Sequence, residues 1–470
     1  MTTTVATPST GTRTGAVLAL ACAAQFVVVL DVAVVNVALP SIRADLGLSA
    51  DALHWVVVAY SLLLGSFLLL GGRICDTFGR RTALILGLVV FTLASVGAGA
   101  APNETVLLAA RAVQGLGAAL IPPAALATIA ITFNDQAARS RALGLYGAVT
   151  GMSASVGVLA SGLITENLGW RWVFLVNLPI GISLAVAAAA LLPRERPRVG
   201  PRGNGIASSL AVSAGIFLLI FGLSEGSTHG WLRIESVASL LAALLLLAYF
   251  GWLQGRDPTP LVPHEIRRRA VLSAAATAFF LFAALLAFIF LGSLLMQQLL
   301  AYSSATTGLG WLAMTATSFI AAALTGTKLL PLVGIRPLIV IGLVLLAAAA
   351  VVAGFTGADA HYATGVMPAL ILAGTAGGLS APAVQLGALT GVPDHAAGVA
   401  SGLLETMRDL GGSVGIAAVA TALASAGNLD TQLADAFRHA YWIVAALALA
   451  GAVTALTTFR PHTINPKDAR

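Results

Sequence analysis

GRICDTFGRR, at residues 72–81, is a short charged turn between two long apolar segments. The segments on either side, 53–72 and 82–101, are each about 20 residues long, the length at which an α-helix crosses the hydrocarbon core of a bilayer. Their Ala, Gly, Leu and Val residues do not alternate with polar residues, as the strands of a membrane β-barrel would. The stretch therefore predicts two membrane-spanning helices joined by a tight polar loop.

The rest of the chain repeats this pattern. Of its 470 residues, 58% are hydrophobic and only 9% are charged, whereas soluble domains carry roughly 25% charged residues. The composition therefore predicts an all-α integral membrane protein. We expect fourteen spans, at residues 16–39, 53–72, 82–101, 106–132, 142–165, 171–192, 205–224, 234–253, 271–297, 306–330, 336–356, 362–386, 396–425 and 438–459.

The distribution of positive charge gives the expected direction of the spans. If the amino terminus is cytoplasmic, 19 of the 25 Lys and Arg residues fall in cytoplasmic segments, and the outer loops hold only Arg43, Arg171, Arg233 and Arg438. Both termini are then expected in the cytoplasm. Because topology explains the scattered basic residues, the net charge of +6 gives no reason to expect a nucleic-acid partner, and the lipid bilayer is the expected surrounding.

The two halves of the chain resemble each other at a nearly constant offset. Four matches in the same order argue against chance similarity: residues 79–82 with 334–337, 115–123 with 374–382, 135–138 with 394–397, and 155–158 with 413–416. We therefore expect one six-helix unit used twice, with a substrate cavity between the halves near the bilayer midplane. The expected organisation is a disordered cytoplasmic N-terminus at 1–15, six-helix bundles at 16–192 and 271–459, two inserted spans with linkers at 193–270, and a cytoplasmic tail at 460–470.

Single charges of opposite sign lie in two of the spans. Asp31 lies in the first span and Arg111 in the fourth. Charges at membrane depth are costly to bury, and they usually pair, line a water-filled cavity and mark an ion or substrate path. Protonation of Asp31 would free the Arg111 guanidinium and change which cavity state is favoured. The alternative is a static ion pair that locks two helices together.

A second group of charges lies in the segment 396–425. Glu405, Arg408 and Asp409 are spaced to share one helical face. Arg408 could neutralise one acid and leave the other as a proton carrier or as a recognition point for a cationic substrate. The alternative is a self-satisfied triad near the cytoplasmic end of the helix.

The polar loop at 72–81 is a candidate conformational latch. A carboxylate and several guanidiniums in a short turn can form charge-assisted hydrogen bonds to neighbouring helix ends. The alternative, that Arg80 and Arg81 only orient the protein, does not extend to Asp76, because acids contribute little to orientation. The expected latch residues are Gly72, Asp76, Gly79, Arg80 and Arg81.

The same loop resembles the G-x-x-x-D-x-x-G-R-R/K motif of the major facilitator superfamily. Residues 30–40 (LDVAVVNVALP), 111–117 (RAVQGLG) and 170–174 (WRWVF, with Asn177 following) are similar to motifs of its fourteen-span drug:proton antiporters (EmrB/QacA type). The resemblance covers nearly the whole chain. It implies the major facilitator fold, with two six-helix bundles and two inserted central spans, and it implies that Arg111 couples proton movement to substrate.

The fifth span departs from the pattern of that family, which has Gly-Pro followed by Gly-Gly. Here Val158 follows Gly157, and Ser161-Gly162 replaces the glycine pair, so the proline-dependent bend is missing. A small-residue surface for close helix packing remains, formed by Gly147, Gly151, Gly157 and Gly162.

Polar and aromatic side chains in the spans supply candidates for the substrate cavity. Aromatic rings suit flat apolar or cationic compounds through stacking and cation–π contacts, although each ring alone is more often packing or lipid belt. The candidates are Gln25, Asn36, Gln114, Tyr60 and Trp311. The chain has no phosphate-binding Gly-Lys-Ser/Thr pattern and no paired metal motif. We therefore expect no cofactor or metal, and a proton gradient as the energy source.

These observations predict a proton-driven exporter of drugs, antibiotics or related hydrophobic compounds, cationic ones included. It is expected to act as a monomer in a bacterial plasma membrane on small-molecule substrates. The Ala-, Gly- and Arg-rich, Lys-poor composition favours a GC-rich genome such as that of an actinobacterium. The alternative is a major facilitator transporter of a specific metabolite or amino acid. A membrane enzyme is disfavoured, because the sequence shows no catalytic constellation and no soluble domain.

Overall fold

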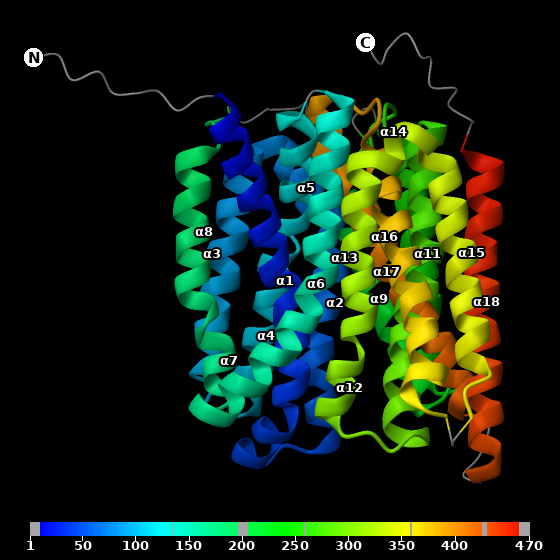
Figure 1. The fold of residues 1–470 in the computed structure, drawn as a ribbon. Helices are drawn as coiled ribbons and strands as arrows, with labels where there is room; N and C mark the ends of the chain where they lie inside the picture. The colour runs from blue at the N-terminus through cyan, green and yellow to red at the C-terminus, as the bar shows by residue number, and fades with distance from the viewer. Residues whose placement is uncertain are drawn as a thin grey trace, which may run out of the picture.

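The structure, a computed structural model, describes residues 10–133, 135–195, 205–257, 260–357, 360–424 and 430–459. Every regular element in these ranges is a helix, so the expected all-α architecture is confirmed for the described residues (Figure 1). The expected disordered segment 1–15 falls largely outside these ranges, and the expected tail 460–470 falls outside them completely.

The helices form two groups separated by an inserted pair. The first group comprises α1 (Thr10–Leu46), α2 (Ala50–Phe78), α3 (Arg80–Gly99), α4 (Glu104–Ala118), α5 (Ile121–Thr132), α6 (Gln136–Leu168), α7 (Arg171–Leu175) and α8 (Asn177–Leu191). The inserted pair is α9 (Gly205–His229) and α10 (Ile234–Arg256). The last group comprises α11 (Arg269–Leu294), η1 (Leu295–Leu299), α12 (Ser304–Gly310), α13 (Leu312–Leu324), η2 (Thr325–Leu329), α14 (Leu330–Val333), α15 (Ile335–Gly354), η3 (Tyr362–Val366), α16 (Met367–Leu389), η4 (Asp394–Ala396), α17 (Ala397–Ala424) and α18 (Asp430–Thr458).

Twelve helical segments among the described residues are long and apolar enough to cross a membrane. They are α1, α2, α3, α4 with α5, α7 with α8, α9, α10, α11 with η1, α12 through α14, α15, η3 with α16, and α18. This confirms a multi-pass membrane protein. In Figure 1, α1 begins and α18 ends at the same end of the bundle.

Two further long helices, α6 with 33 residues and α17 with 28, lie at the positions expected for spans 142–165 and 396–425. Neither is among the twelve apolar segments found in the described residues. α6 contains five glycines, and α17 carries three charged side chains, Glu405, Arg408 and Asp409.

The helix packing of the first group recurs in the last. α1 packs on α6 as α11 packs on α17, and α3 packs on α4 and α8 as α15 packs on α16 and α18. The two groups lie side by side in Figure 1, the first on the left and the last on the right. They meet along two seams, one between α2 and α17 and the other between α6 and α13 with η2.

Glycine backbone contacts form both seams. At the first, a Cβ atom on Gly72 would overlap the carbonyl oxygen of Gly398. At the second, a Cβ on Gly144 would lie 2.7 Å from the Cα of Gly326. Absent side chains let helix backbones approach closely, which favours association of helices in lipid. The two groups are therefore in direct backbone contact on both sides of the bundle.

The inserted helix α9 packs on both α2 and α17, whereas α10 packs mainly on α9. The ring of Phe221 in α9 stacks on Trp55 of α2, with centroids 5.9 Å apart. The indole Nε1 of Trp231, just after α9, donates a 3.0 Å hydrogen bond to Thr421 Oγ1 of α17. Helix α9 therefore covers the seam between α2 and α17.

Candidate functional site

An ion pair is buried inside the first group of helices. Nη1 of Arg111 on α4 lies 2.6 Å from Oδ2 of Asp31 on α1, and each side chain is only 1% exposed. The sequence places the two residues 80 positions apart, and the packing of α1, α4 and their neighbours brings them together. Because neither charge reaches solvent, each depends on the other and on nearby dipoles for its stability.

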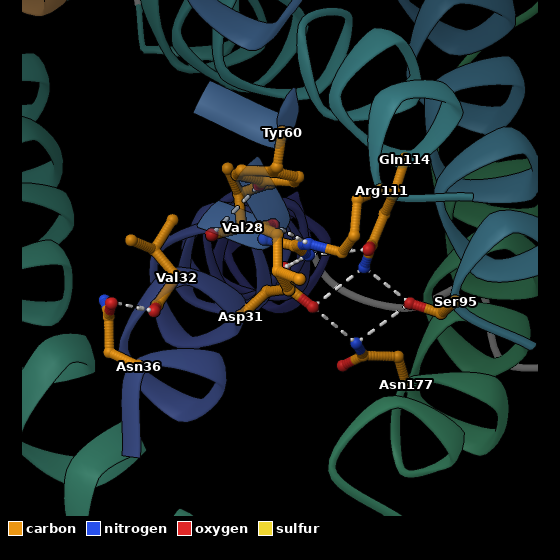
Figure 2. Close-up of polar contacts among 10 residues, drawn as sticks. Val28, Asp31, Val32, Asn36, Tyr60, Ser95, Arg111, Gln114 and Asn177 are labelled. Carbon is orange, nitrogen blue, oxygen red and sulfur yellow. Dashed lines mark hydrogen bonds and ion pairs between the residues drawn. The ribbon is translucent and has the colours of Figure 1, made fainter. Parts of the chain in front are cut away.

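Three neutral side chains complete a hydrogen-bonded network around this pair (Figure 2). Gln114 accepts from Arg111 Nη1 at 2.7 Å and donates to Asp31 Oδ1 at 2.8 Å. Asn177 Nδ2, at the start of α8, also donates to Asp31 Oδ1, at 3.0 Å. The hydroxyl of Ser95 on α3 accepts from both amides, at 2.6 and 3.1 Å. Four helices therefore contribute to one buried polar site.

The Arg111 guanidinium has further contacts on the side of α2. Its Nε donates to the backbone oxygen of Val56 at 3.0 Å. Its Cζ lies 4.3 Å from the ring centroid of Tyr60 and 5.7 Å from that of Phe174. A cation over an aromatic face is stabilised by the ring quadrupole. Tyr60 and Gln114, expected near substrate, therefore lie in the immediate surroundings of the ion pair.

The second charged group lies on α17. Arg408 Nη1 is 3.1 Å from Glu405 Oε2, and its Cζ lies 4.6 Å from the ring centroid of Phe282 on α11. The other oxygen of Glu405, Oε1, is buried and has no hydrogen-bond partner among the described residues. Asp409 packs against α2, where a Cβ on Gly65 would overlap its carboxylate. The three residues share one region, but Asp409 points across the seam.

The candidate latch joins the two groups of helices. Both carboxylate oxygens of Asp76 accept backbone hydrogen bonds from the first turn of α17, at 2.7 Å from Gly398 N and 2.8 Å from Val399 N. An acidic side chain that accepts from these N–H groups satisfies helix donors and complements the positive end of the helix dipole. Asp76 therefore caps a helix that belongs to the other group.

The basic residues of the latch loop have a different role. Arg80 pairs with Glu195, which follows α8, through its side chain and through its backbone N–H at 3.1 Å. Gly79 precedes α3 with φ of 90°, a conformation that favours glycine. Nε of Arg81 is buried without a hydrogen-bond partner among the described residues. Arg80 therefore ties the loop to its own group, while Asp76 ties it to the other.

The remaining cavity candidates are separated in the structure. Gln25 is buried on α1, and its Oε1 has no hydrogen-bond partner among the described residues. Asn36 is exposed, and its amide donates to Val32 O of its own helix at 2.9 Å, away from the ion pair (Figure 2). Trp311 packs against α11, 2.9 Å from where a Cβ on Gly292 would lie. The structure does not bring Asn36 or Trp311 to the Asp31–Arg111 network.

The expected small-residue surface of α6 is only partly used. Cβ atoms on Gly147, Gly151 and Gly157 would meet Pro382, Ser318 and Ala33, respectively, at 3.2, 3.3 and 2.8 Å. The expectation is wrong for Gly162, where a Cβ would meet nothing within 4 Å among the described residues. Its neighbour Ser161 faces α1 instead and donates to Val34 O at 2.6 Å. The side chain of Val158 lies outside the described residues.

Comparison with known proteins agrees with this architecture. The family model for the Major Facilitator Superfamily matches residues 21–416. The chain belongs to the major facilitator superfamily. Its helices therefore form a transporter of this superfamily rather than an enzyme.

Two relatives are antibiotic resistance or export proteins of actinobacteria. The chain is 37% identical to the puromycin resistance protein pur8 of Streptomyces alboniger, over 92% of this chain and 88% of that protein. It is 36% identical to the cephamycin export protein CmcT of Amycolatopsis lactamdurans, over 95% of this chain and 93% of that protein. Among solved structures, the human organic anion transporter MFSD10 superposes with a TM-score of 0.71 at 16% identity, covering 94% of this chain and 99% of that one, which shows the fold alone.

Sequence reasoning missed three side chains of these sites, Ser95, Asn177 and Glu195, and Asn177 entered it only as part of a family motif. Ser95 is one small polar residue among many in the spans, and no sequence signal marks it. Glu195 had a detectable signal, because it is the one acid in the arginine-rich stretch 194–202 that follows the sixth span. Its partner Arg80 lies 115 residues away, so only the fold identifies the pair.

Proposed function

We propose that this major facilitator is a proton-driven antiporter that exports antibiotics or related hydrophobic compounds, cationic ones included. The observation that carries the proposal is the fully buried Asp31–Arg111 pair in a chain whose relatives are named for puromycin resistance and cephamycin export. A buried, paired acid in a membrane helix is the usual means by which a transporter takes up and releases a proton.

The proposed topology has fourteen spans of the EmrB/QacA type, with α6 and α17 counted beside the twelve apolar segments. The domains are then the six-span bundles 16–192 and 271–459 around the inserted region 193–270. The proposed location is the bacterial plasma membrane, with both termini in the cytoplasm; the Arg and Lys residues that crowd the loops at one end of the bundle support this orientation. The protein acts as a monomer without a cofactor.

In the proposed cycle, a proton on Asp31 neutralises the partner of Arg111. The guanidinium then loses its strongest attraction to α1, and the balance between the two cavity states changes. The latch formed by Asp76 holds the α2–α17 seam closed in the state described here and must break when the seam opens. Glu405 and Asp409 supply negative charge in the other bundle, where they attract cationic substrate or carry a further proton.

The experiment is transport by the purified protein in sealed vesicles. Puromycin, cephamycin and the cation ethidium are tested as substrates, with a pH difference imposed across the membrane. We expect accumulation of at least one compound that depends on the pH difference and disappears with an uncoupler. The matched control is Asp31→Asn, which cannot take up a proton and should transport none of them against a gradient. Flux that is indifferent to the pH difference contradicts the proposal.

A second measurement separates drug export from transport of a defined metabolite. Cells that lack their main efflux pumps are made to overproduce the protein or its Asp31→Asn variant. Drug export predicts increased tolerance to part of an antibiotic panel with the unaltered protein and no increase with the variant. Unchanged tolerance to the whole panel would favour the metabolite alternative.

A further inference from the structure

We propose that Asn177 reports the protonation state of Asp31 by rotating its side-chain amide, and so acts as a positioning residue for the proton site. The inference rests on the proposed function, because it requires that Asp31 gains and loses a proton. It concerns a residue of α8 that contacts neither Arg111 nor the latch through any hydrogen bond described here.

The starting point is that Asp31 is surrounded by donors alone. Oδ1 accepts from the amides of Gln114 and Asn177, and Oδ2 accepts from Arg111. These hydrogen bonds suit a carboxylate, which only accepts. Once Asp31 is protonated, its O–H needs an acceptor, and none of the atoms now bonded to it can accept in its present orientation.

Neither Arg111 nor Gln114 can readily supply that acceptor. A guanidinium has donors only. The oxygen of Gln114 already accepts from Arg111 Nη1 at 2.7 Å, a charge-assisted bond that would be lost on rotation. Rotation of Gln114 would also turn its NH₂ group towards the cation. Both residues are therefore fixed as donors to Asp31.

Asn177 differs, because its oxygen Oδ1 is buried without a hydrogen-bond partner among the described residues. A half-turn of the amide exchanges Nδ2 for Oδ1 at the position facing Asp31 and Ser95. The oxygen then accepts the new O–H of Asp31. The Ser95 hydroxyl, which can donate as well as accept, turns its hydrogen to the same oxygen and continues to accept from Gln114 at 2.6 Å.

The consequence is a change at the first residue of α8. In the carboxylate state, Asn177 donates two hydrogen bonds, to α1 and α3; in the protonated state it accepts from both. Among the described residues, Arg111 is the one ionisable side chain hydrogen-bonded to Asp31, and Tyr60 stacks on that guanidinium while donating its hydroxyl to Val28 O. The rotation therefore follows the charge of Asp31.

The test is infrared difference spectroscopy of the full-length protein in lipid vesicles, between alkaline and acidic buffer. The carbonyl band of protonated Asp31 is identified by its absence in Asp31→Asn. We expect Asn177→Leu to shift this band to higher wavenumber, because the O–H loses its acceptor. With isotope-labelled asparagine, the unaltered protein should show a side-chain carbonyl band that moves to lower wavenumber on acidification and is missing from Asn177→Leu.

Asn167→Leu is the matched control, because Asn167 is exposed and its amide donates to Leu163 O of its own helix at 2.8 Å. It should leave both bands unchanged. In transport, Asn177→Leu should reduce pH-driven accumulation about fivefold to tenfold, the contribution of one hydrogen bond, while substrate exchange without a gradient persists. Asn177→Ala, which only removes volume, provides the same readouts if the leucine variant does not fold.

An Asp31 band that stays in place in both Asn177 variants overturns this inference and leaves the proposed function intact. A spectrum without any Asp31-dependent band overturns both, since the acid then never takes up a proton. A shifted band together with an unchanged asparagine carbonyl also overturns the inference, because Asn177 would then act by packing alone.

Discussion

Asp76 of α2 caps the N-terminus of α17 at Gly398, 322 residues further along the chain. Replacing Asp76 with Asn removes the charge that complements the helix dipole and should weaken the seam by about 1 kcal/mol. Cys75, next to it, is 1% exposed and reports opening of this seam. In a Cys22→Ser background, we expect Asp76→Asn to accelerate maleimide labelling of Cys75 about fivefold.

Asp135→Asn is the control for this prediction. Asp135 caps α6 by accepting from Ala138 N at 2.8 Å, so it makes the same kind of contact within one bundle. Its replacement should leave the labelling rate of Cys75 unchanged. Equal labelling rates of Cys75 in the Cys22→Ser background and in its Asp76→Asn and Asp135→Asn derivatives would show that the Asp76 cap does not hold the seam.

The second prediction concerns stability of the buried ion pair. Asp31→Asn leaves the Arg111 guanidinium buried without a counter-ion, which should cost about 3–5 kcal/mol in the free energy of unfolding. Adding Arg111→Gln to the same chain removes the uncompensated charge and should recover part of the loss. Unfolding of the single and double variants in detergent measures the coupling. Strictly additive losses would be inconsistent with a pair whose two charges depend on each other.

The third prediction tests the contact of Asp409 with α2. An Ala side chain at Gly65 overlaps the Asp409 carboxylate, so Gly65→Ala should lower stability by about 1–3 kcal/mol. In Gly251→Ala, on α10, the new Cβ meets nothing within 4 Å among the described residues. That change should be neutral or stabilising by up to about 1 kcal/mol. Adding Asp409→Ala should restore the stability that Gly65→Ala loses. If stability is not restored, the loss has a cause other than the overlap with the Asp409 carboxylate.

The fourth prediction is a pH dependence at the C-terminal end of α1. Hydrogen bonds from Arg171, at 2.5 Å, and from Trp170, at 3.1 Å, hold the pKa of the Asp45 carboxyl below its usual value. A lowered folded-state pKa contributes stability above the ordinary carboxyl pKa of about 3.9, and the contribution is lost as pH falls through the folded-state value.

Melting temperatures of the unaltered protein and of Asp45→Asn, measured as a function of pH, check this sign. The variant should melt at a slightly lower temperature near neutral pH. The difference should shrink as the pH falls below about 4 and vanish below the lowered folded-state pKa of Asp45. The effect is small because both side chains are substantially exposed, and added salt should reduce it. A difference that grows on acidification would contradict the assignment.

The fifth prediction concerns the contact of the inserted pair with α17. Trp231→Phe and Thr421→Val each remove one partner of the 3.0 Å hydrogen bond and should each cost about 0.5–1.5 kcal/mol. The double variant should lose little more than either single one, because only one bond is broken. Thermal unfolding of the unaltered protein, the two single variants and the double variant gives the coupling energy between the two side chains. Fully additive losses would mean that the two side chains act independently.

The positions of the helices could be predicted from sequence because bilayer thickness and backbone hydrogen bonding restrict what can cross a membrane. The same physics predicted that Asp31 and Arg111 would need each other. It could not predict Ser95 or Asn177, because a neutral polar side chain becomes part of a site only when the fold brings donors and acceptors within 3 Å or so.

Long-range contacts between the bundles were also beyond the sequence. The loop at 72–81 was identified as a latch, but its partner is the backbone of Gly398 and Val399, which has no side-chain signature. The predictions for Asn36, as a cavity residue, and for Gly162, as a packing residue, failed although the residue types were suitable. Their residue types fit the expected roles, but helix rotation directs Asn36 outwards and leaves Gly162 without a close neighbour.

Helices α9 and α10 make the two lateral faces of the transporter unequal. α9 lies against α2 and α17, while the related contact between α6 and α13 has no such inserted helix packed on it among the described residues. The seam between α2 and α17 is therefore shielded from the surrounding lipid by α9, whereas the inserted pair leaves the seam between α6 and α13 uncovered among the described residues.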